Sequence, residues 1–393
     1  MTATATAPAE VPSRPAPARD LDRWLPLGLA VIVYIPLLLT HPGMVGADTK
    51  QYLYLDPGRM LSQAWQMWDP SVGMGTVTHQ NIGYLLPMGP WYWALHATHV
   101  PTWVAQRLWT ATLLYVAGLG MRDLCHTIGW GAPGTARAGR LAGVGVTVAS
   151  LSFMLTPYVL EYVARISAIL MPWAALPWMI SLVIRALRTG SWRHPALFAL
   201  VIALCGGVNA TSLIFAGIAP VLWFPFAVWV YREVDLRRAL TTLVRVGVLT
   251  VLTNLWWMAG LLTQAGYGLD VLRYTETVQV VAQTGFALEA LRGLGNWYFY
   301  GRDAVGPWVQ PAAEYTQQLW HLAVSYVLPI LAFISAVATK WRTKLYFITL
   351  IVVGTTISLI ISIVGLVALV VIVWLWVRDT RRDVAELPEE HSH

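Results

Sequence analysis

Runs of apolar residues, each long enough to cross a lipid bilayer, constrain this chain more than any other feature of its sequence. They extend over roughly 17 to 23 residues with almost no charge, and a helix of that length crosses about 30 Å of hydrocarbon. Only 12% of the 393 residues are charged and 57% are hydrophobic, whereas a soluble domain carries about 25% charged residues. The sequence therefore predicts an all-α polytopic membrane protein.

The last apolar run, Leu345–Val377, is longer than one membrane span needs but shorter than two full spans need. We favour a tight helical pair with its bend near Ser362 and Gly365, which makes about ten spans rather than nine. The expected spans are Trp24–Thr40, Trp103–Met121, Leu141–Thr156, Ile166–Ile184, Ala196–Val208, Ser212–Val230, Leu240–Leu262, His321–Ala338 and the long run Leu345–Val377.

Basic clusters between the runs predict the orientation. With the N-terminus in the cytoplasm, the loops around Arg137, Arg188, Arg237 and Arg342 all face the cytoplasm, as the positive-inside rule requires. The opposite loops carry only scattered basic residues. We interpret the net charge of +6 as a topology signal and expect no nucleic-acid partner.

Two connections on the extracytoplasmic side are long, at residues 42–101 and 263–320, and long loops in compact proteins are usually functional. In the first, apolar residues at helical spacing predict an amphipathic helix over 58–68 that lies on the outer leaflet. We expect a disordered cytoplasmic tail at 1–23, a membrane domain at 24–344, the terminal span or spans at 345–377, and a cytoplasmic tail at 378–393.

Familiar catalytic motifs are missing. The chain has no Walker loop, HExxH, GxSxG or CxxC. The GxGxxG match at Gly129–Gly134 contains Pro133 and follows no predicted strand, so it does not indicate a dinucleotide site. His96 and His99 lack a third metal ligand nearby, so no metal site is predicted, and the membrane separates Cys125 from Cys205, so no disulfide is expected.

Charged residues at the outer rim remain as candidates. Asp48 and Lys50 follow the first span directly, and a partly desolvated carboxylate there can have a raised pKa and serve as a base. The alternative is a solvated Asp that caps a helix. Glu161 and Arg165 could pair on one helical face, or Arg165 could hold a substrate phosphate in its guanidinium fork.

One resemblance adds to this interpretation. The first long loop contains D-T-K after the span, W-D-P and Q-N-x-G-Y-L-x-P-x-G, and Q-R-L-W follows it. In combination these motifs resemble the N-terminal membrane domain of actinobacterial alpha-(1->3)-arabinofuranosyltransferases. The likeness runs from about Trp24 to about Tyr346. Members of that family are much longer, and the residues after Tyr346 do not resemble their continuation.

The resemblance implies a C-type glycosyltransferase of the plasma membrane with an extracytoplasmic active site. It implies decaprenylphosphoryl-arabinofuranose as donor, cell-envelope arabinan as acceptor, membrane lipids around the spans and possible partner subunits. Asp48 matches the family's acidic position and would be the general base of an inverting displacement. No cofactor is required, and a divalent cation stays possible. The other candidates are Arg165, Lys50 and Arg302 for the donor phosphate, and Glu161, Trp65, Trp68, Gln80, Asn81 and Tyr84 for the acceptor sugar.

Two alternatives stay open: a transporter or flippase for polyprenyl-linked sugars, and a truncated relative without activity. Transporters more often place ionisable residues near the bilayer midplane or contain internal repeats. The predicted spans are almost free of charge and show no repeat. The sequence therefore favours the enzyme.

The predicted orientation can be tested by labelling. In intact cells an impermeant maleimide should label Ser71→Cys, in the first long outer loop, and should not label Thr135→Cys, in a basic inner loop. Labelling of Thr135→Cys without Ser71→Cys would reverse the topology.

Overall fold

The computed structural model describes residues 19–70, 74–77, 81–130, 136–163, 165–267, 284–285, 287–339 and 341–361. This described part is almost entirely helical. Its strands are β1 (Trp68–Asp69) and β2 (Thr76–Val77), which pair antiparallel. The predicted all-α fold is confirmed.

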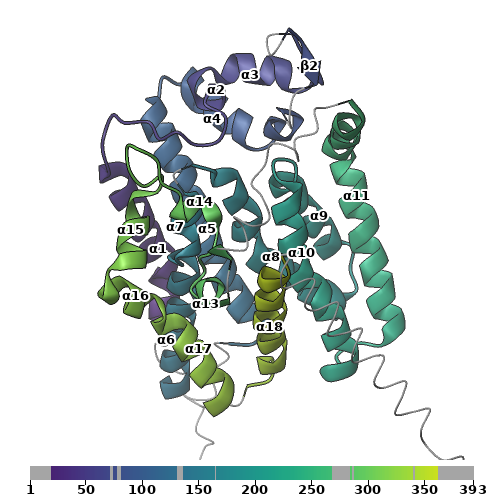
Figure 1. Cartoon of the computed structure of the whole chain (residues 1–393). Coiled ribbons are helices and arrows are strands. Elements are labelled where there is room, and N and C mark those ends of the chain that lie inside the picture. Colours follow the sequence, from purple (N-terminus) through teal and green to yellow (C-terminus); the bar gives the residue numbers. More distant parts are fainter. Residues whose placement is uncertain are drawn as a thin grey trace, which may run out of the picture.

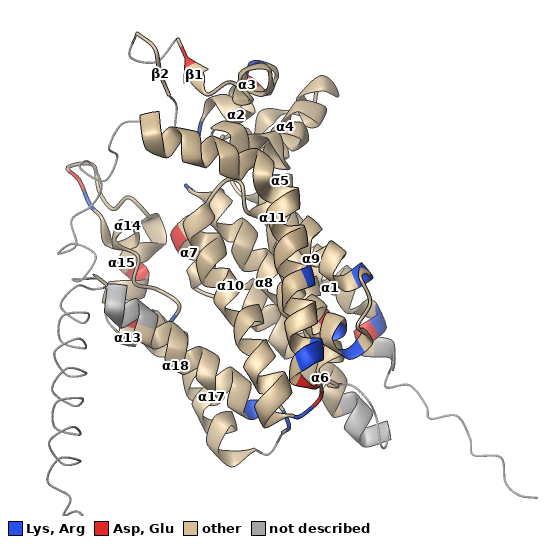
Figure 2. Cartoon of the chain, turned by 90° about the vertical axis from the view of Figure 1, so that its right-hand side faces the viewer, with Lys and Arg blue, Asp and Glu red and all other residues tan. Residues whose placement is uncertain are grey.

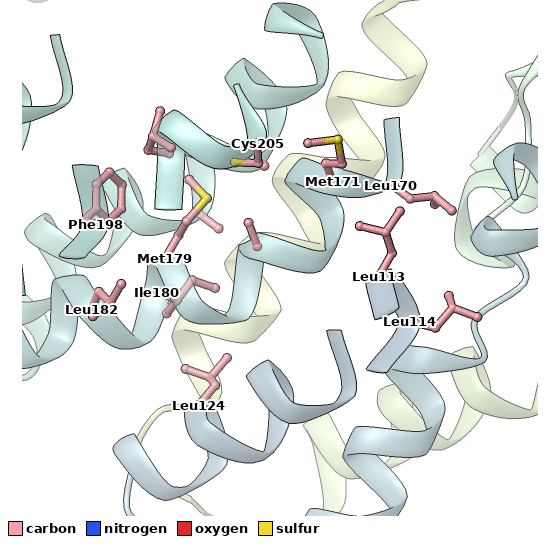
Figure 3. Packing of buried hydrophobic residues seen from close by; sticks show 14 of the residues in the cluster. Leu113, Leu114, Leu124, Leu170, Met171, Met179, Ile180, Leu182, Phe198 and Cys205 are labelled. Atoms are coloured by element: carbon pink, nitrogen blue, oxygen red, sulfur yellow. The ribbon is translucent and has the colours of Figure 1, made fainter. Parts of the chain in front are cut away.

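A bundle of long helices forms the body of the molecule (Figure 1). Helix α8 is central, because 78% of its most apolar window is buried and it packs against α5, α9 and α10. Figure 3 shows the apolar side chains that join them, among them Leu113, Met179 and Phe198. The bundle helices are α1 (Arg19–Leu39), α5 (Thr102–Thr127), α6 (Ala136–Met154), α8 (Leu170–Thr189), α9 (Arg193–Cys205), α10 (Ala210–Pro225), α11 (Leu236–Tyr267), α16 (Leu319–Ser325), α17 (Val327–Ala338) and α18 (Lys344–Ile361).

The lengths and composition of these helices make the chain a multi-pass membrane protein. Within the described residues, 6 helical stretches are long and apolar enough to cross a bilayer, and α9 and α18 contain shorter apolar helices. Helix α5 has the length of a span but carries Arg107, Arg122 and Asp123. A total of about ten spans stays a prediction. The 6 stretches are Leu21–Leu39, Leu141–Tyr162, Ser167–Thr189, Ala210–Val230, Leu236–Tyr267 and Leu319–Ala338.

Lys and Arg residues gather mainly at one end of the bundle, which we call the basic end (Figure 2). Exposed ion pairs of this kind contribute only about 0–1 kcal/mol each, so they fix the relative positions of helix ends more than they stabilise the fold. The basic end contains three of the loops predicted to be cytoplasmic. Its ion pairs are Arg122–Asp22, Arg185–Asp123, Arg188–Glu233 and Arg342–Glu233.

The first long loop forms a layer across the opposite end of the bundle, which we call the loop end (Figure 1). Asp56 begins α3 by accepting a hydrogen bond from the Arg59 backbone N–H, and Pro57 occupies the first helical position, where a missing N–H is harmless. The layer consists of α2 (Tyr52–Leu55), α3 (Pro57–Ala64), β1, β2, the 3₁₀ helix η1 (Asn81–Leu85) and α4 (Met88–Ala97).

Helix α3 lies across the ends of the long helices in both views (Figures 1 and 2), as expected of a helix on the outer surface. It ends at Ala64, four positions before the predicted end at 68, because Trp68 pairs with Val77 in the β1–β2 hairpin. Met60 and Ala64 form its buried side.

The second long loop packs beside α7 (Tyr158–Tyr162). Its short helices enclose a small apolar cluster of their own around Phe299, with Leu294 and Val309. These helices are α13 (Ala287–Leu291), α14 (Trp297–Tyr300) and α15 (Gln310–Gln317).

The ends of the chain differ in part from the sequence expectation. Helix α1 begins at Arg19 rather than Trp24, and its first turns are tied to α5 by the Asp22–Arg122 pair. Helix α18 reaches Ile361. The predicted bend at Ser362 and Gly365, the tail at 378–393 and most of the tail at 1–23 lie outside the described residues.

A close backbone contact joins the loop end to the bundle. A Cβ added to Gly83 would lie 2.0 Å from the carbonyl oxygen of Gly207, between α9 and α10. We expect Gly83→Ala to destabilise the protein by about 1–3 kcal/mol, since backbone cannot yield as a flexible side chain does. Thermal unfolding in detergent measures this. Gly145→Ala, where a Cβ meets nothing within 4 Å, is the matched control, and equal unfolding temperatures of the two variants would contradict the prediction.

Candidate functional site

Asp48 stands at the centre of the loop end. Its residue is only 3% exposed, although it follows the end of α1 by few residues. Its Oδ1 accepts hydrogen bonds from the Ser167 backbone N–H and the Thr49 hydroxyl, both at 2.8 Å, and its Oδ2 accepts one from the Ser167 hydroxyl. The alternative of a solvated, helix-capping Asp does not describe this buried carboxylate.

These hydrogen bonds join two loops that are far apart in the sequence. Ser167 opens the 3₁₀ helix η2 (Ser167–Ile169), directly before α8. The Thr49 backbone N–H also donates to the Arg165 carbonyl at 2.6 Å. The segment after α1 and the segment between α7 and α8 are therefore held together at Asp48.

The Q-R-L-W motif at the start of α5 holds the same segment from the other side. The Gln106 side chain donates to the Gly46 carbonyl at 2.9 Å and accepts from the Gly46 N–H at 2.8 Å. Arg107 donates to the Met44 carbonyl. The Trp109 indole N–H donates to the Ser167 hydroxyl oxygen at 3.2 Å, so this motif reaches Asp48 through Ser167.

Aromatic rings surround the carboxylate. Three tyrosines, Tyr54, Tyr84 and Tyr92, lie close enough to Asp48 that its negative charge adds to burial in raising their pKa. The ring centroids of Tyr54 and Tyr92 are 5.9 Å apart. The buried Tyr92 hydroxyl has no hydrogen-bond partner within the structure, so it remains as a polar group beside the candidate base.

The pKa of Asp48 reflects two opposed effects. Burial removes water from the carboxylate and raises its pKa, while the hydrogen bonds from Ser167 and Thr49 lower it; burial is the larger effect, and the net pKa lies above the usual value. A carboxylate with a raised pKa is a stronger base once it is ionised.

Lys50 lies two residues further along the chain. Its ammonium donates to the Asn81 side-chain oxygen and lies over the rings of Tyr84 and Tyr52, at 5.5 Å and 6.0 Å from their centroids. Burial lowers the Lys50 pKa to about 8, although the nearby Asp69 carboxylate acts in the opposite direction. Lys50 is therefore largely protonated at neutral pH and can attract an anion.

Three residues of the Q-N-x-G-Y motif make specific contacts in the structure. Asn81 binds Lys50, Gly83 contacts Gly207, and the buried Tyr84 lies beneath Lys50. Gln80, predicted to bind the acceptor, lies outside the described residues. Asn81 and Tyr84 thus belong to the same cluster as Lys50.

The expected pairing of Glu161 with Arg165 is wrong. Helix α7 ends at Tyr162, so the two residues do not share one helical face. The buried Glu161 accepts instead from the Asn296 backbone N–H at 2.9 Å, and this contact connects α7 to the second long loop. Glu161 thus has a structural partner, and its predicted contact with an acceptor sugar stays a prediction.

Arg165 is exposed beside the Asp48 segment. Its guanidinium donates to the Trp308 carbonyl at 3.2 Å and lies 5.9 Å from the Tyr298 ring centroid. These contacts hold the side chain while leaving it accessible to an anion. Arg302 is also exposed, and its backbone pairs with Pro307.

Trp65 and Trp68 are 65% and 56% exposed. The Trp65 indole donates to the Ser62 carbonyl, and the Trp68 ring covers Gly75, where an added Cβ would lie 2.3 Å from it. Both rings therefore present surface at the loop end. Their predicted stacking on a sugar stays a prediction.

Two hollows are lined in part by α10 and α11. A small cleft of about 10 Å³ at the loop end includes Asn81 and Gly207, with Trp257 of α11. An apolar groove of about 300 Å³ runs between α10 and α11, with α8 and α9 also lining it. Helices α10 and α11 line both hollows: Ala210 and Trp257 contribute to the cleft, and Leu213 and Leu243 to the groove.

Among the described residues, no group of three or more His, Cys, Asp or Glu could hold a metal ion. His79 lies outside that part of the chain, and the possible divalent cation stays an untested expectation.

Sequence reasoning missed Ser167, Gln106 and Trp109 as site residues. Gln106 and Trp109 belong to the Q-R-L-W motif, so the family resemblance marks both positions without assigning them a role at the site. Ser167 carries no such signal, because a lone Ser at the start of a predicted span looks like any other polar residue at a helix boundary.

Comparisons with known proteins identify the family of this chain. Residues 32–375 match the family described as alpha-(1->3)-arabinofuranosyltransferase, N-terminal GT-C domain. The match continues past Tyr346, the end of the resemblance seen in the sequence.

Two curated relatives are named alpha-(1->3)-arabinofuranosyltransferase. The one from Mycobacterium tuberculosis is 31% identical over 283 residues, which cover 70% of this chain and 19% of that protein. The one from Mycolicibacterium smegmatis is 31% identical over 281 residues, which cover 69% and 18%. The chain thus spans about a fifth of the length of these relatives.

Cryo-EM structures of the mycobacterial arabinofuranosyltransferase AftD have a similar fold. A point mutant gives a TM-score of 0.57 at 23% identity, covering 86% of this chain and 27% of that one. Another AftD structure gives 0.55 at 22% identity, covering 87% and 27%. The family match and the curated relatives together show that this chain belongs to the family of alpha-(1->3)-arabinofuranosyltransferase N-terminal GT-C domains.

Proposed function

We propose that this chain transfers arabinofuranose from a decaprenyl-phosphate donor to an arabinan of the cell envelope, at the extracytoplasmic side of the plasma membrane. The buried carboxylate of Asp48, held between the segment after α1 and the segment before α8, is the observation that carries the proposal. Family membership supports the sugar and the class of transfer. The basic end lies opposite to the end of the bundle that carries α2, α3 and α4, which supports the assignment of sides.

Asp48 is the general base in this proposal. The acceptor hydroxyl gives its proton to the Asp48 carboxylate while its oxygen bonds to the anomeric carbon. The bond between that carbon and the lipid phosphate breaks, and the phosphate monoester leaves with the electron pair. One displacement inverts the anomeric centre, and one base suffices, in contrast to the two carboxylates of a retaining glycosidase.

Lys50 and Arg165 are the cations available to the leaving phosphate. Lys50 is held in place by Asn81 and two tyrosine rings, and Arg165 by the Trp308 carbonyl. Guanidinium and ammonium groups both bind phosphate oxygens, the guanidinium in a fork. Arg302 is a third, exposed candidate. The negative charge that develops on the leaving phosphate would therefore be stabilised by the Lys50 ammonium or the Arg165 guanidinium, both of which are held in place.

The apolar groove supports a lipid-linked donor. Its lining is almost wholly apolar and includes Gly217 of α10 and Gly247 of α11, where an added Cβ meets nothing within 4 Å. Helices α10 and α11 lead from this groove to the cleft beside Asn81, the partner of Lys50. An isoprenoid chain in the groove would leave its phosphate at the loop end.

Replacement of the base tests the mechanism. We expect Asp48→Asn to lower turnover by about a hundred- to ten-thousand-fold, the usual contribution of a positioned general base, with little change in donor affinity. The measurement is transfer of radiolabelled arabinose from its decaprenyl phosphate to an oligoarabinoside by purified protein in nanodiscs.

Asp56→Asn is the matched control, because Asp56 is exposed and Asn caps a helix equally well. Asp48→Asn with more than half of the wild-type rate would remove Asp48 as the base. Wild-type protein that is inactive on every arabinoside tried would contradict the proposed activity of this chain.

Filling the groove tests the lipid chain separately. Gly217→Leu and Gly247→Leu should raise KM for the decaprenyl donor on the order of tenfold, the effect of losing about two buried methylene contacts. A donor with only two isoprene units should be affected less than twofold. Gly145→Leu, on α6 with equal space, is the control. Equal effects on long and short donors would exclude the groove as the chain site.

A further inference from the structure

We infer that Ser167 and Trp109 form a positioning relay that orients the Asp48 carboxylate and keeps it ionised. This inference rests on the proposed role of Asp48 as the base and deepens it. Ser167 contacts Asp48 rather than the reacting atoms, so it is a positioning residue.

The hydrogen-bond directions within the relay are fixed by its donors. An indole nitrogen can only donate, so the Trp109 N–H gives its hydrogen to the Ser167 oxygen. The Ser167 hydroxyl hydrogen is thereby directed at Asp48 Oδ2, while the Ser167 backbone N–H donates to Oδ1. One residue thus holds both oxygens of the carboxylate and fixes its plane.

Burial increases the effect of these hydrogen bonds on the ionised carboxylate of Asp48. Ser167 is 0% exposed and Trp109 is 4% exposed, so neither hydrogen bond competes with bulk water. A buried carboxylate without donors is far less stable in its ionised form. Trp109 also lies 6.3 Å from Tyr92 between ring centroids, so its ring is held by packing as well as by its hydrogen bond.

Several other groups face Asp48 and bear on its titration. Tyr54 of α2, Tyr84 of η1 and Tyr92 of α4 surround it, and burial raises the pKa of each tyrosine, so all three are neutral in the range where Asp48 titrates. Thr49 donates a third hydrogen bond. The nearby cations Lys50 and Arg165 are directed at Asn81 and Trp308. The hydrogen-bond donors to Asp48 therefore offset its burial most directly.

Removing a donor should raise the pKa of Asp48 further. The base acts only when ionised, so activity rises with pH through its pKa, and the acid limb of the pH–rate profile should move to higher pH. For Ser167→Ala we expect a shift of about one to two pH units, the effect of one lost hydrogen bond to a charged group. Trp109→Phe keeps the ring but removes the N–H, and should give a smaller shift in the same direction.

Matched variants separate this effect from general damage. Ser181→Ala in α8 also removes the hydroxyl of a fully buried Ser, but that hydroxyl has no hydrogen-bond partner among the described residues, so the acid limb of this variant should not move. Ser167→Cys retains a weak donor and should fall between wild type and Ser167→Ala. The alkaline limb, to which Lys50 contributes near its pKa of about 8, should stay in place in all four variants.

A second readout is independent of activity. The carbonyl band of protonated Asp48, identified in infrared pH-difference spectra by its loss in Asp48→Asn, should disappear at higher pH in Ser167→Ala than in wild type. Ser167→Ala with unchanged infrared titration would overturn the relay. If the spectra shift but no variant or wild type transfers arabinose, the relay stands and the proposed function fails.

Discussion

A buried carboxylate at the loop end sets the conditions for the rest of this site. An ionised Asp in an apolar environment is stable only when donors surround it, and Asp48 obtains them from Ser167 and Thr49. These donors belong to loops after α1 and before α8. The two loops must therefore be held against each other, and Gln106 and Trp109 of α5 hold them.

The glycines and aromatic residues of the loop end also help to enclose the Asp48 carboxylate. Gly83 lets η1 approach the α9–α10 connection at backbone distance, which brings Tyr84 beneath Lys50 and close to Asp48. Tyrosine rings exclude water without adding charge. The carboxylate thus experiences a desolvated surrounding that raises its pKa and a set of donors that limits the rise.

The sequence predicted the features that depend on local pattern. The apolar runs identified the bundle helices, and apolar residues at helical spacing predicted the surface helix, which begins at Pro57. Position after the first span and the family motif made Asp48 a candidate base, and the structure shows that it is buried. Two site contacts that the sequence did not predict join distant segments: Ser167 on Asp48, and Asn296 on Glu161. Such pairings depend on tertiary packing, which spacing along the chain does not encode.

Asp48, the proposed base, and Arg165, the candidate phosphate-binding arginine, are linked through one short stretch of backbone. The Thr49 N–H bonds the Arg165 carbonyl, and Asp48 and Ser167 flank that contact. A shift of the segment between α7 and α8 would therefore displace Asp48 and Arg165 together. In the proposed reaction one group receives the acceptor proton while the other stabilises the leaving phosphate, so their relative position decides the geometry of attack. Glu161, by tying the same segment to the second long loop through Asn296, extends this rigidity to the other side of the site.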